Sequence, residues 1–399
     1  MKELTEETWR FIHNHRKDDV RYLALQAKKY PDVDMAEAVV QISGWQIAEK
    51  KLPLWAKIDG ILFPRHLSME QCSSEFTAEY KSTLASGGTM VDLTAGLGVD
   101  CSFLARNFDT VHYVERQEEL CELARNNFPR LGLNHICVHN ADGVEYLHDM
   151  QPVDCIFMDP ARRDSNGGKT VAISDCEPDV CALEELLVEK AGMVMVKLSP
   201  MLDIFSALRD LHYIRSVHVV SVNNECKELI LILSKHHMTD NITENKVSIS
   251  CEQLVNNSVG QHFTFAYEDE KNAVGRWADN VMNYLYEPGA ALLKAGPFRL
   301  LSERYEVQQL SANSHLYTSA QMVDFPGRRF CVEGVSGFGK KELKSFLSGV
   351  SQANITIRNF PSTVADLRKK LKLKDGGELY LFATTLRDGS KVLVKCRKV

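Results

Sequence analysis

The chain has 399 residues, 44% hydrophobic and 25% charged, an ordinary composition for a globular protein of two or three domains. No apolar run reaches the roughly 20 residues that span a membrane, and the first residues are acidic and polar, so we expect a cytoplasmic protein with no membrane partner. The 11 cysteines lie singly, without a CxxC pair, which predicts free thiols and no metal site.

The first eighty residues predict helices, over 6–15, 18–25, 34–51 and 77–85. Pro53 ends the third, and the fourth leads into a turn at Gly87-Gly88. From residue 89 the pattern changes to strands at 90–93, 110–115, 136–140, 154–158 and 193–197, with helices between them. This alternation predicts a parallel, doubly wound α/β sheet. Two more strands, 216–222 and 228–233, have no helix between them, which places one antiparallel strand in the sheet.

The C-terminal part predicts a different architecture. Strands are expected at 247–251 and 262–266, and helices at 289–295 and 297–305. The last 75 residues read as strand, helix (340–347), strand, helix (363–373) and a hairpin, a small α+β unit.

The loop after the first strand has the pattern Asp-x-Thr-x-Gly-x-Gly before a helix. Its candidate cofactor-binding residues are Asp92, Thr94, Gly96, Gly98 and Asp100. Glycines let the backbone approach a ligand, and the helix presents free N–H groups. A dinucleotide site needs a third glycine at the position that Cys101 occupies. The loop therefore favours a cofactor with an amino acid end, whose ammonium group can donate hydrogen bonds to Asp92. An ordinary strand-to-helix turn is the alternative.

Carboxylates end the next two strands. Glu115, 17 residues beyond Gly98, can accept both hydroxyls of a ribose, or it is a solvated strand end. Asp142 can accept an adenine amine, and Gly143 gives the ring room, although Asp-Gly is also a common turn. Loop and carboxylates together predict a pocket for S-adenosylmethionine.

The fourth strand ends in Asp159-Pro160, a rigid turn with an exposed carboxylate and carbonyl. Both can accept hydrogen bonds from an exocyclic amine, so we interpret Asp159 and Pro160 as the catalytic pair for amine methylation. Arg162 and Arg163 follow, and they contact a substrate phosphate or are solvated surface charges. Lys197, at the end of the fifth strand, orients Asp159, meets a phosphate or forms a structural salt bridge.

At these positions the chain resembles the class I methyltransferases. The turn at 159–162 is similar to the (Asp/Asn)-Pro-Pro-(aromatic) motif of nucleic-acid amine methyltransferases, but Ala161 replaces the second proline and Arg162 the aromatic. An arginine plane can still stack on a base. The segment 70–77 looks like the one that covers the methionine end of the cofactor in such enzymes, which implies cofactor contacts for Gln71 and Ser73. A helix cap also explains this segment.

A closer likeness covers nearly the whole chain. The segments that carry it are Asp-Asp-Val-Arg (18–21), Leu-Pro-Leu-Trp (52–55), Glu-Gln-Cys-Ser-Ser-Glu (70–75), Asp-Pro-Ala-Arg-Arg (159–163), Ser-Pro-Met-Leu-Asp-Ile (199–204) and Asn-Glu-Cys-Lys-Glu-Leu (224–229). They resemble the bacterial methyltransferases with a C-terminal THUMP-like domain. The resemblance implies a helical N-terminal domain (1–80), a Rossmann-like, seven-stranded methyltransferase domain (81–240), a ferredoxin-like module (241–325) and a THUMP-like module (326–399). THUMP domains are associated with RNA binding, so RNA is the implied partner.

Charge is unevenly distributed in a way that fits this partner. Residues 325–399 contain 16 Lys and Arg against 6 Asp and Glu, a net charge of +10, whereas the remainder carries 31 against 47, a net charge of −16. A basic segment on an acidic body favours a polyanion, with Arg368, Lys369 and Lys370 as phosphate contacts. A solvated helix face is the alternative.

The sequence therefore predicts an S-adenosylmethionine-dependent methyltransferase acting on a base amine in RNA, either rRNA or tRNA. Two hypotheses stand beside it: a small-molecule or protein methyltransferase, and a non-catalytic RNA-binding protein that keeps the cofactor fold.

Overall fold

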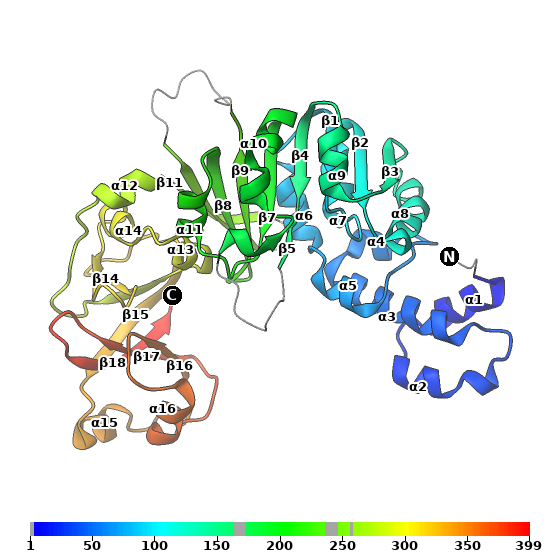
Figure 1. Ribbon diagram of the computed structural model, residues 1–399. Coiled ribbons are helices and arrows are strands. Elements are labelled where there is room, and N and C mark those ends of the chain that lie inside the picture. Colours follow the sequence, from blue (N-terminus) through cyan, green and yellow to red (C-terminus); the bar gives the residue numbers. More distant parts are fainter. Residues whose placement is uncertain (1–3, 163–171, 236–245, 256–257) are drawn as a thin grey trace. The chain divides into compact units, whose positions relative to one another are not determined.

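The computed structural model describes residues 4–162, 172–235, 246–255 and 258–399, which fall into two compact units (Figure 1). The first unit comprises Met1–Ser216 and Glu228–Thr243, and the second comprises Val217–Lys227 and Glu244–Val399. Within the described ranges, no helix is both long enough and apolar enough to cross a bilayer.

Helices make up the N-terminal part of the first unit, as predicted. They are α1 (Glu6–Asn14), α2 (Val20–Leu25), α3 (Met35–Lys51), α4 (Pro53–Ala56), α5 (His66–Gln71) and α6 (Glu75–Ser82), with a 3₁₀ turn η1 (Ala27–Lys29). The helices that were predicted begin at side-chain caps: Thr5, Asp19, Asp34 and Ser74 each accept a backbone N–H of the first turn. Pro53 ends α3 and begins α4, where its missing N–H costs nothing.

A twisted sheet follows in the first unit, with strand order β9-β7-β4-β1-β2-β3. Its strands are β1 (Gly87–Asp92), β2 (Phe108–Glu115), β3 (Ile136–Asn140), β4 (Val153–Met158), β7 (Ala191–Leu198) and β9 (Glu225–Leu233). β9 pairs antiparallel with β7, and the other pairs are parallel, which confirms the predicted single antiparallel strand. Central residues such as Val111, Ile156 and Val194 are completely buried, as expected for strands covered on both faces.

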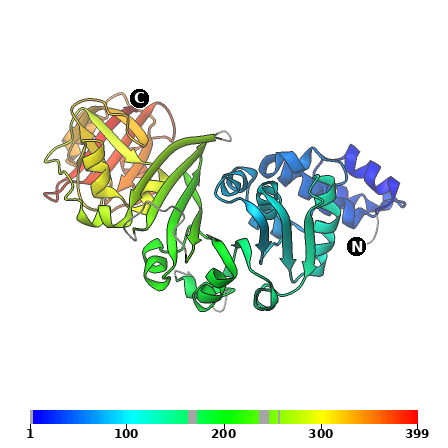
Figure 2. The ribbon, with the colours of Figure 1, turned by 90° about the horizontal axis from the view of Figure 1, so that it is seen from above.

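Helices connect the strands of this sheet (Figure 2). They are α7 (Val99–Leu104), α8 (Glu118–Arg130), α9 (Gly143–Asp149), α10 (Val180–Lys190) and α11 (Ile204–Asp210), with 3₁₀ turns η2 (Ala105–Asn107) and η3 (Ile173–Asp175). A two-stranded ribbon, β5 (Ala161–Arg162) with β6 (Cys176–Glu177), follows the Asp159-Pro160 turn and was not predicted. The carboxyl ends of β1, β2, β3 and β4 thus lie at one edge of the sheet, where ligands bind in such folds.

The prediction of a turn at Gly87-Gly88 is wrong, because both glycines belong to β1. The Asp154 carboxylate on neighbouring β4 explains why glycine is needed there. It accepts the N–H groups of Gly88 and Thr89, both at 2.8 Å, and a Cβ on Gly87 would lie 2.8 Å from the Asp154 Cβ. The glycine pair therefore makes room for a side chain that anchors the start of the strand.

The second unit contains β8 (Ile214–Val222) from Val217 onward, with β10 (Ser248–Val255) and β11 (Ser258–Ala266) beside it in the order β11-β10-β8. These two strands are additional to the seven predicted for the sheet. They form an antiparallel hairpin, and pairing with β8 satisfies backbone groups that a free hairpin edge would leave open.

A second, seven-stranded sheet has the order β13-β14-β12-β15-β18-β17-β16. Its strands are β12 (Tyr284–Pro288), β13 (Gln308–Gln309), β14 (Tyr317–Ser319), β15 (Gly327–Ser336), β16 (Asn354–Arg358), β17 (Leu379–Thr385) and β18 (Lys391–Lys398). The helices of this unit are α12 (Tyr267–Asn272), α13 (Ala290–Ala295), α14 (Phe298–Arg304), α15 (Lys340–Phe346) and α16 (Val364–Leu371). The pairing of β12 with β15 makes one sheet of two segments that the sequence assigns to different modules.

Candidate active site

A cavity of about 520 Å³ opens at the carboxyl ends of the parallel strands of the first unit. Its lining includes four of the predicted site residues with side chains able to bind a ligand, namely Thr94, Glu115, Asp142 and Asp159. The ribbon β5–β6 and the start of α10 supply another part of the wall, through Ala161, Glu177, Pro178, Asp179, Ala182 and Leu183. The loop, the two carboxylates and the Asp-Pro turn, scattered over some seventy residues of sequence, thus meet at one cavity.

The glycine loop is tied directly to the end of β2. The Gly96 N–H donates to Glu115 Oε2 at 2.9 Å, and the Tyr113 hydroxyl donates to the Gly96 carbonyl. Gly98 caps α7 with a φ of +81°, and a Cβ there would lie 2.7 Å from the Phe128 ring. Both the backbone conformation and the packing therefore require glycine at position 98.

Glu115 is buried at the cavity wall, with only 8% of its surface exposed. Its Oε1 accepts the Gln117 N–H at 2.9 Å, while Oε2 accepts Gly96. The Gln117 side-chain amide also donates to Oε1, at 3.4 Å, so these bonds orient the group and leave one acceptor position on Oε2. A solvated strand-end charge, the alternative, does not describe this residue.

Asp142 and Gly143 form the next part of the wall. Asp142 Oδ1 caps α9 by accepting the N–H groups of Val144 and Glu145, at 2.9 and 3.2 Å. A Cβ on Gly143 would lie 2.1 Å from the Leu93 carbonyl oxygen. The glycine is thus required by the close approach of α9 to the end of β1, whereas the sequence suggested room for a ligand ring.

Asp92 lies beneath the loop and is almost completely buried. Its Oδ1 accepts the Thr94 N–H at 3.1 Å, and the Thr94 hydroxyl in turn accepts the Asp159 N–H at 2.6 Å. Burial raises the pKa of Asp92 well above its usual range, and the negative charges of Asp100 and Asp159 raise it further. Thr94 thus links the floor of the loop to the Asp159-Pro160 turn.

The Asp159 carboxylate is partly open, with 38% of its side chain exposed, and Pro160 is buried. Lys197 Nζ lies 2.5 Å from Asp159 Oδ2. Lys197 also contacts Asp100 Oδ2 at 3.1 Å and the Ser73 hydroxyl at 3.0 Å. Lys197 thus forms a salt bridge to Asp159, and its three ammonium donors all face protein atoms.

Asp100 and Ser73 lie behind this pair. The Ser73 hydroxyl donates to Asp100 Oδ2 at 2.7 Å, and both residues are buried. Burial alone would raise the pKa of Asp100, but the ammonium groups of Lys197 and Lys81 outweigh it and hold the pKa below its usual range. Gln71, two residues before Ser73, is exposed.

Sequence reasoning missed Lys81 and Glu228, which complete this cluster. Lys81 Nζ lies 2.5 Å from Glu228 Oε1, and both side chains are buried. Lys81 follows Thr77 and Ala78 at helical spacing, and all three are buried. A lysine on the apolar face of a helix is therefore the signal that could have identified it.

The remaining predicted substrate residues differ in what the structure describes. Arg162 belongs to β5, but its side chain lies outside the described residues, and so does Arg163. Among the described residues no cluster of three or more metal-ligating side chains occurs.

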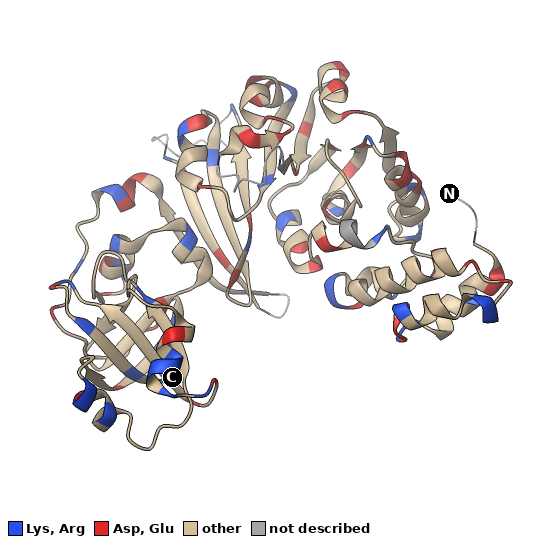
Figure 3. Cartoon of the chain, turned by 60° about the horizontal axis from the view of Figure 1, so that its bottom comes forward, with Lys and Arg blue, Asp and Glu red and all other residues tan. Residues whose placement is uncertain are grey.

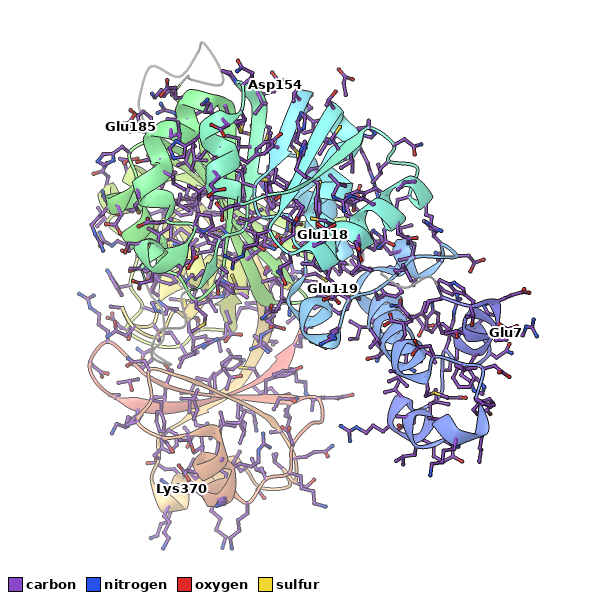
Figure 4. All side chains as sticks on the ribbon, turned by 45° about the vertical axis from the view of Figure 1, so that its right-hand side comes forward. Glu7, Glu118, Glu119, Asp154, Glu185 and Lys370 are labelled. Atoms are coloured by element: carbon purple, nitrogen blue, oxygen red, sulfur yellow. The ribbon has the colours of Figure 1, made fainter. Side chains whose placement is uncertain are left out.

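The predicted phosphate contacts of the second unit are on α16. Lys369 and Lys370 are exposed; Figure 4 labels Lys370, whose ammonium lies 5.5 Å from the centre of the Phe338 ring. Arg368 instead donates to the Ala353 carbonyl at 3.1 Å and to Asp375 Oδ1 at 2.6 Å, a structural role. The neighbouring α15 adds three exposed lysines, and Figure 3 shows Lys and Arg positions in blue along the cartoon of this part of the chain. We call the following set the basic face: Lys340, Lys341, Lys344, Lys369 and Lys370.

Three family models match the chain. One described as a THUMP domain-like family matches residues 327–398, and one described as a ferredoxin-like domain matches residues 284–326. A third, described as protein-L-isoaspartate(D-aspartate) O-methyltransferase, matches residues 65–165.

Two relatives extend these matches. A protein-L-isoaspartate O-methyltransferase from Roseiflexus sp. (strain RS-1) is 36% identical over 78 residues, which are 20% of this chain and 36% of that protein. The chain thus spans about a third of the length of this curated relative. A crystal structure of a Porphyromonas gingivalis W83 protein, provisionally identified as a methyltransferase, is 35% identical, covers 100% of both chains and has a TM-score of 0.88. The chain belongs to the family of class I methyltransferases that carry a C-terminal THUMP-like domain.

Proposed function

We propose that this protein transfers the methyl group of S-adenosylmethionine to an exocyclic amine of a base in RNA, either rRNA or tRNA, in the cytoplasm. The observation that carries the proposal is the shared cavity. Glu115, Asp142 and Asp159 line the same 520 Å³ space, so a nucleoside-binding wall and an amine-accepting carboxylate lie within one site.

The residues fit this cofactor. Glu115 is oriented by two backbone N–H groups; Oε2 has an acceptor position left for one ribose hydroxyl, and Oε1 can accept the other in place of the 3.4 Å bond from the Gln117 side chain. Both capping bonds of Asp142 fall on Oδ1, which leaves Oδ2 for the adenine amine. Asp92 offers a carboxylate for the methionine end, whereas both oxygens of Asp100 face ammonium groups, Oδ1 that of Lys81 and Oδ2 that of Lys197, each at 3.1 Å.

The cofactor, when bound, supplies an electrophilic methyl group on its sulfonium. Asp159 accepts an N–H of the substrate amine through the oxygen that Lys197 does not hold, and so orients the nitrogen lone pair toward the methyl carbon. The fixed carboxylate of Asp159 would also stabilise the positive charge that a substrate nitrogen acquires when it is methylated. The excess proton on nitrogen then passes to water.

RNA is proposed as the substrate because of the basic face. Its lysines are exposed on α15 and α16, whose apolar sides share one core cluster containing Leu343 and Leu367. Such a surface neutralises backbone phosphates without reading sequence.

Methylation of a protein carboxylate is the second candidate, and the match to the isoaspartate O-methyltransferase model favours it. That match ends at residue 165, so it covers the cofactor half of the domain and stops before β7. A negatively charged carboxylate substrate would also meet Asp159 as a like charge, whereas an amine meets it as a hydrogen-bond donor.

Three measurements on the full chain test the proposal. Calorimetry should detect binding of S-adenosylmethionine, and its absence would favour the non-catalytic alternative. Transfer of radiolabelled methyl groups should occur to RNA from a strain lacking the gene, and not to an isoaspartyl peptide. Mass spectrometry of nucleosides from rRNA and tRNA, with and without the gene, then identifies the base.

The variant Asp159→Asn tests the proposed chemistry. It keeps the shape of the side chain and removes the charge, so transfer should fall at least 10-fold while cofactor binding is retained. Asp149→Asn, an exposed aspartate at the end of α9, is the matched control. Full activity of Asp159→Asn would refute the assigned role.

A further inference from the structure

A chain of buried charges leads from Asp159 into the core of the first unit. Its members are Asp159, Lys197, Asp100, Ser73, Lys81 and Glu228. Side-chain exposure falls along it, from 38% for Asp159 to 10% for Lys197 and 0% for Lys81. The proposed function uses only the outer end, so the inner residues need an explanation of their own.

Strand register brings the outer pair together. Met158, the last residue of β4, is opposite Val196 of β7, so the residues that follow them, Asp159 after the end of β4 and Lys197 within β7, lie side by side. Leu198 is opposite Leu229 of β9 on the other side of β7, and Glu228 precedes Leu229. Asp159 and Glu228, the first and last residues of this series of buried charges, thus come from the two strands that flank β7.

Lys197 is held at three points. Its three N–H donors face Asp159 Oδ2 at 2.5 Å, Asp100 Oδ2 at 3.1 Å and the Ser73 hydroxyl at 3.0 Å. A lysine side chain is flexible, so an ammonium group with a single partner would move with that partner. Two anchors in the core instead fix the nitrogen, and through it one oxygen of Asp159.

Lys81 fixes those anchors in turn. Its Nζ lies 3.3 Å from the Ser73 hydroxyl and 3.1 Å from Asp100 Oδ1, the latter an ion pair outside hydrogen-bond geometry. The third partner of the Lys81 ammonium is Glu228 Oε1, at 2.5 Å. The same serine and the same carboxylate are therefore shared by both ammonium groups.

Stability is a poor reason for such a cluster. Moving charges from water into a protein interior costs about as much as their attraction returns, and well-packed apolar residues are often as stable. The cluster holds two cations against three carboxylates, and the surplus carboxylate, Asp159, is the one that opens to the cavity. Fixed geometry at that carboxylate is what the buried charges can provide.

We propose that Lys81 and Glu228 are positioning residues for Asp159, acting through Ser73, Asp100 and Lys197. The inference rests on the proposed function, because it assigns a purpose to the placement of the amine-accepting carboxylate. It predicts that damage at Glu228, on β9, reduces the rate of methyl transfer with little effect on cofactor affinity.

The test is the paired variant Lys81→Met with Glu228→Gln, which removes one charge of each sign and leaves no unpaired buried ion. The control is Lys235→Met with Glu185→Gln, a surface ion pair of 3.5 Å in the same unit; Figure 4 labels Glu185. We expect kcat for RNA methylation to fall about 10- to 100-fold, as misplaced catalytic groups produce, with the Kd for S-adenosylmethionine within about 3-fold of wild type. The control pair should change neither.

A double-mutant cycle with Asp159→Asn decides whether the effect passes through Asp159. If it does, adding Asp159→Asn to the paired variant reduces kcat no further than Asp159→Asn alone. Independent, multiplying losses, or an unchanged kcat in the paired variant, would overturn the inference. Should the paired variant not fold, Glu228→Gln alone replaces it in the same cycle.

Failure of the proposed function gives a different result. In that case the wild-type chain itself binds no S-adenosylmethionine or methylates no RNA. A crystal structure of the paired variant then remains informative, because the positioning role requires the contact between Asp159 Oδ2 and Lys197 Nζ to lengthen beyond hydrogen-bond distance. An unchanged contact would overturn the inference without reference to activity.

Discussion

The Gly96 N–H donates a hydrogen bond of 2.9 Å to Glu115 Oε2, which joins the glycine loop after β1 to the carboxylate that ends β2. The two features that indicate a cofactor in the sequence are therefore one structural unit. A change in either should alter both the shape of the loop and the position of Glu115, the proposed acceptor for the ribose hydroxyls.

Glu115→Gln should weaken binding of S-adenosylmethionine about 10- to 100-fold, since a hydrogen bond to a charged group contributes roughly 1.5–3 kcal/mol. Glutamine keeps the length of the side chain but loses the charge and one acceptor. Isothermal calorimetry measures the change. Glu119→Gln, on the exposed start of α8 and labelled in Figure 4, is the control and should leave the Kd unchanged. Equal affinity of Glu115→Gln and wild type would exclude a ribose contact.

Gly143→Ala should strongly destabilise the first unit. The added Cβ would lie 2.1 Å from the Leu93 carbonyl oxygen, a backbone atom that cannot yield without separating α9 from β1. Gly132→Ala is the comparison, because Gly132 has a φ of +77° but nothing within 4 Å, so only backbone strain of about 1–2 kcal/mol applies. Urea unfolding followed by circular dichroism should give Gly143→Ala a much lower free energy of unfolding than Gly132→Ala. The reverse order would mean that α9 can shift freely.

Low pH should destabilise the second unit through His218. Burial, with a smaller contribution from His262, lowers the pKa of His218 to about 4, against about 6.5 in the unfolded chain. Between these values the unfolded state binds a proton that the folded state does not, so stability is complete above pH 6.5 and falls as the pH drops toward 4. The loss is at most about 3 kcal/mol.

His218→Gln removes that titration. Its denaturation midpoint should therefore fall less between pH 7 and pH 4.5 than the wild-type midpoint does, whatever its absolute stability at pH 7. Parallel curves for the two proteins would show that other groups cause the acid sensitivity.

The parts of the site that the sequence predicts are local patterns. The Asp-x-Thr-x-Gly-x-Gly loop, Glu115 and the Asp159-Pro160 turn each follow a strand whose apolar run is visible, and parallel strands bring their ends to one edge. The unpredicted parts depend on contacts distant in sequence. Lys81 and Glu228 are 147 residues apart, and Gly87-Gly88 resembles a turn unless the Asp154 carboxylate is known to face it. Arg368 is a further example. It lies in a run of basic residues, which suggests a phosphate contact, and the sequence does not indicate its hydrogen bond to Asp375.

Neutralising the basic face should weaken RNA binding and its dependence on salt. The variant Lys341→Gln, Lys344→Gln, Lys369→Gln, Lys370→Gln removes four exposed charges from α15 and α16. Each lost phosphate contact lowers the slope of log K against log salt by about 0.7 for single-stranded RNA, so the slope should decrease by up to about 3.

Four exposed lysines of the first unit provide the matched control, Lys17→Gln, Lys28→Gln, Lys29→Gln, Lys50→Gln, with the same change in net charge. Filter binding across a salt series distinguishes the two sets, because a general charge effect would alter both slopes equally. Binding of S-adenosylmethionine should be unaffected in both variants, since the cavity residues lie in the first unit and none of the eight lysines lines it. Loss of RNA affinity in the control set alone would assign the RNA contact to the N-terminal helices instead.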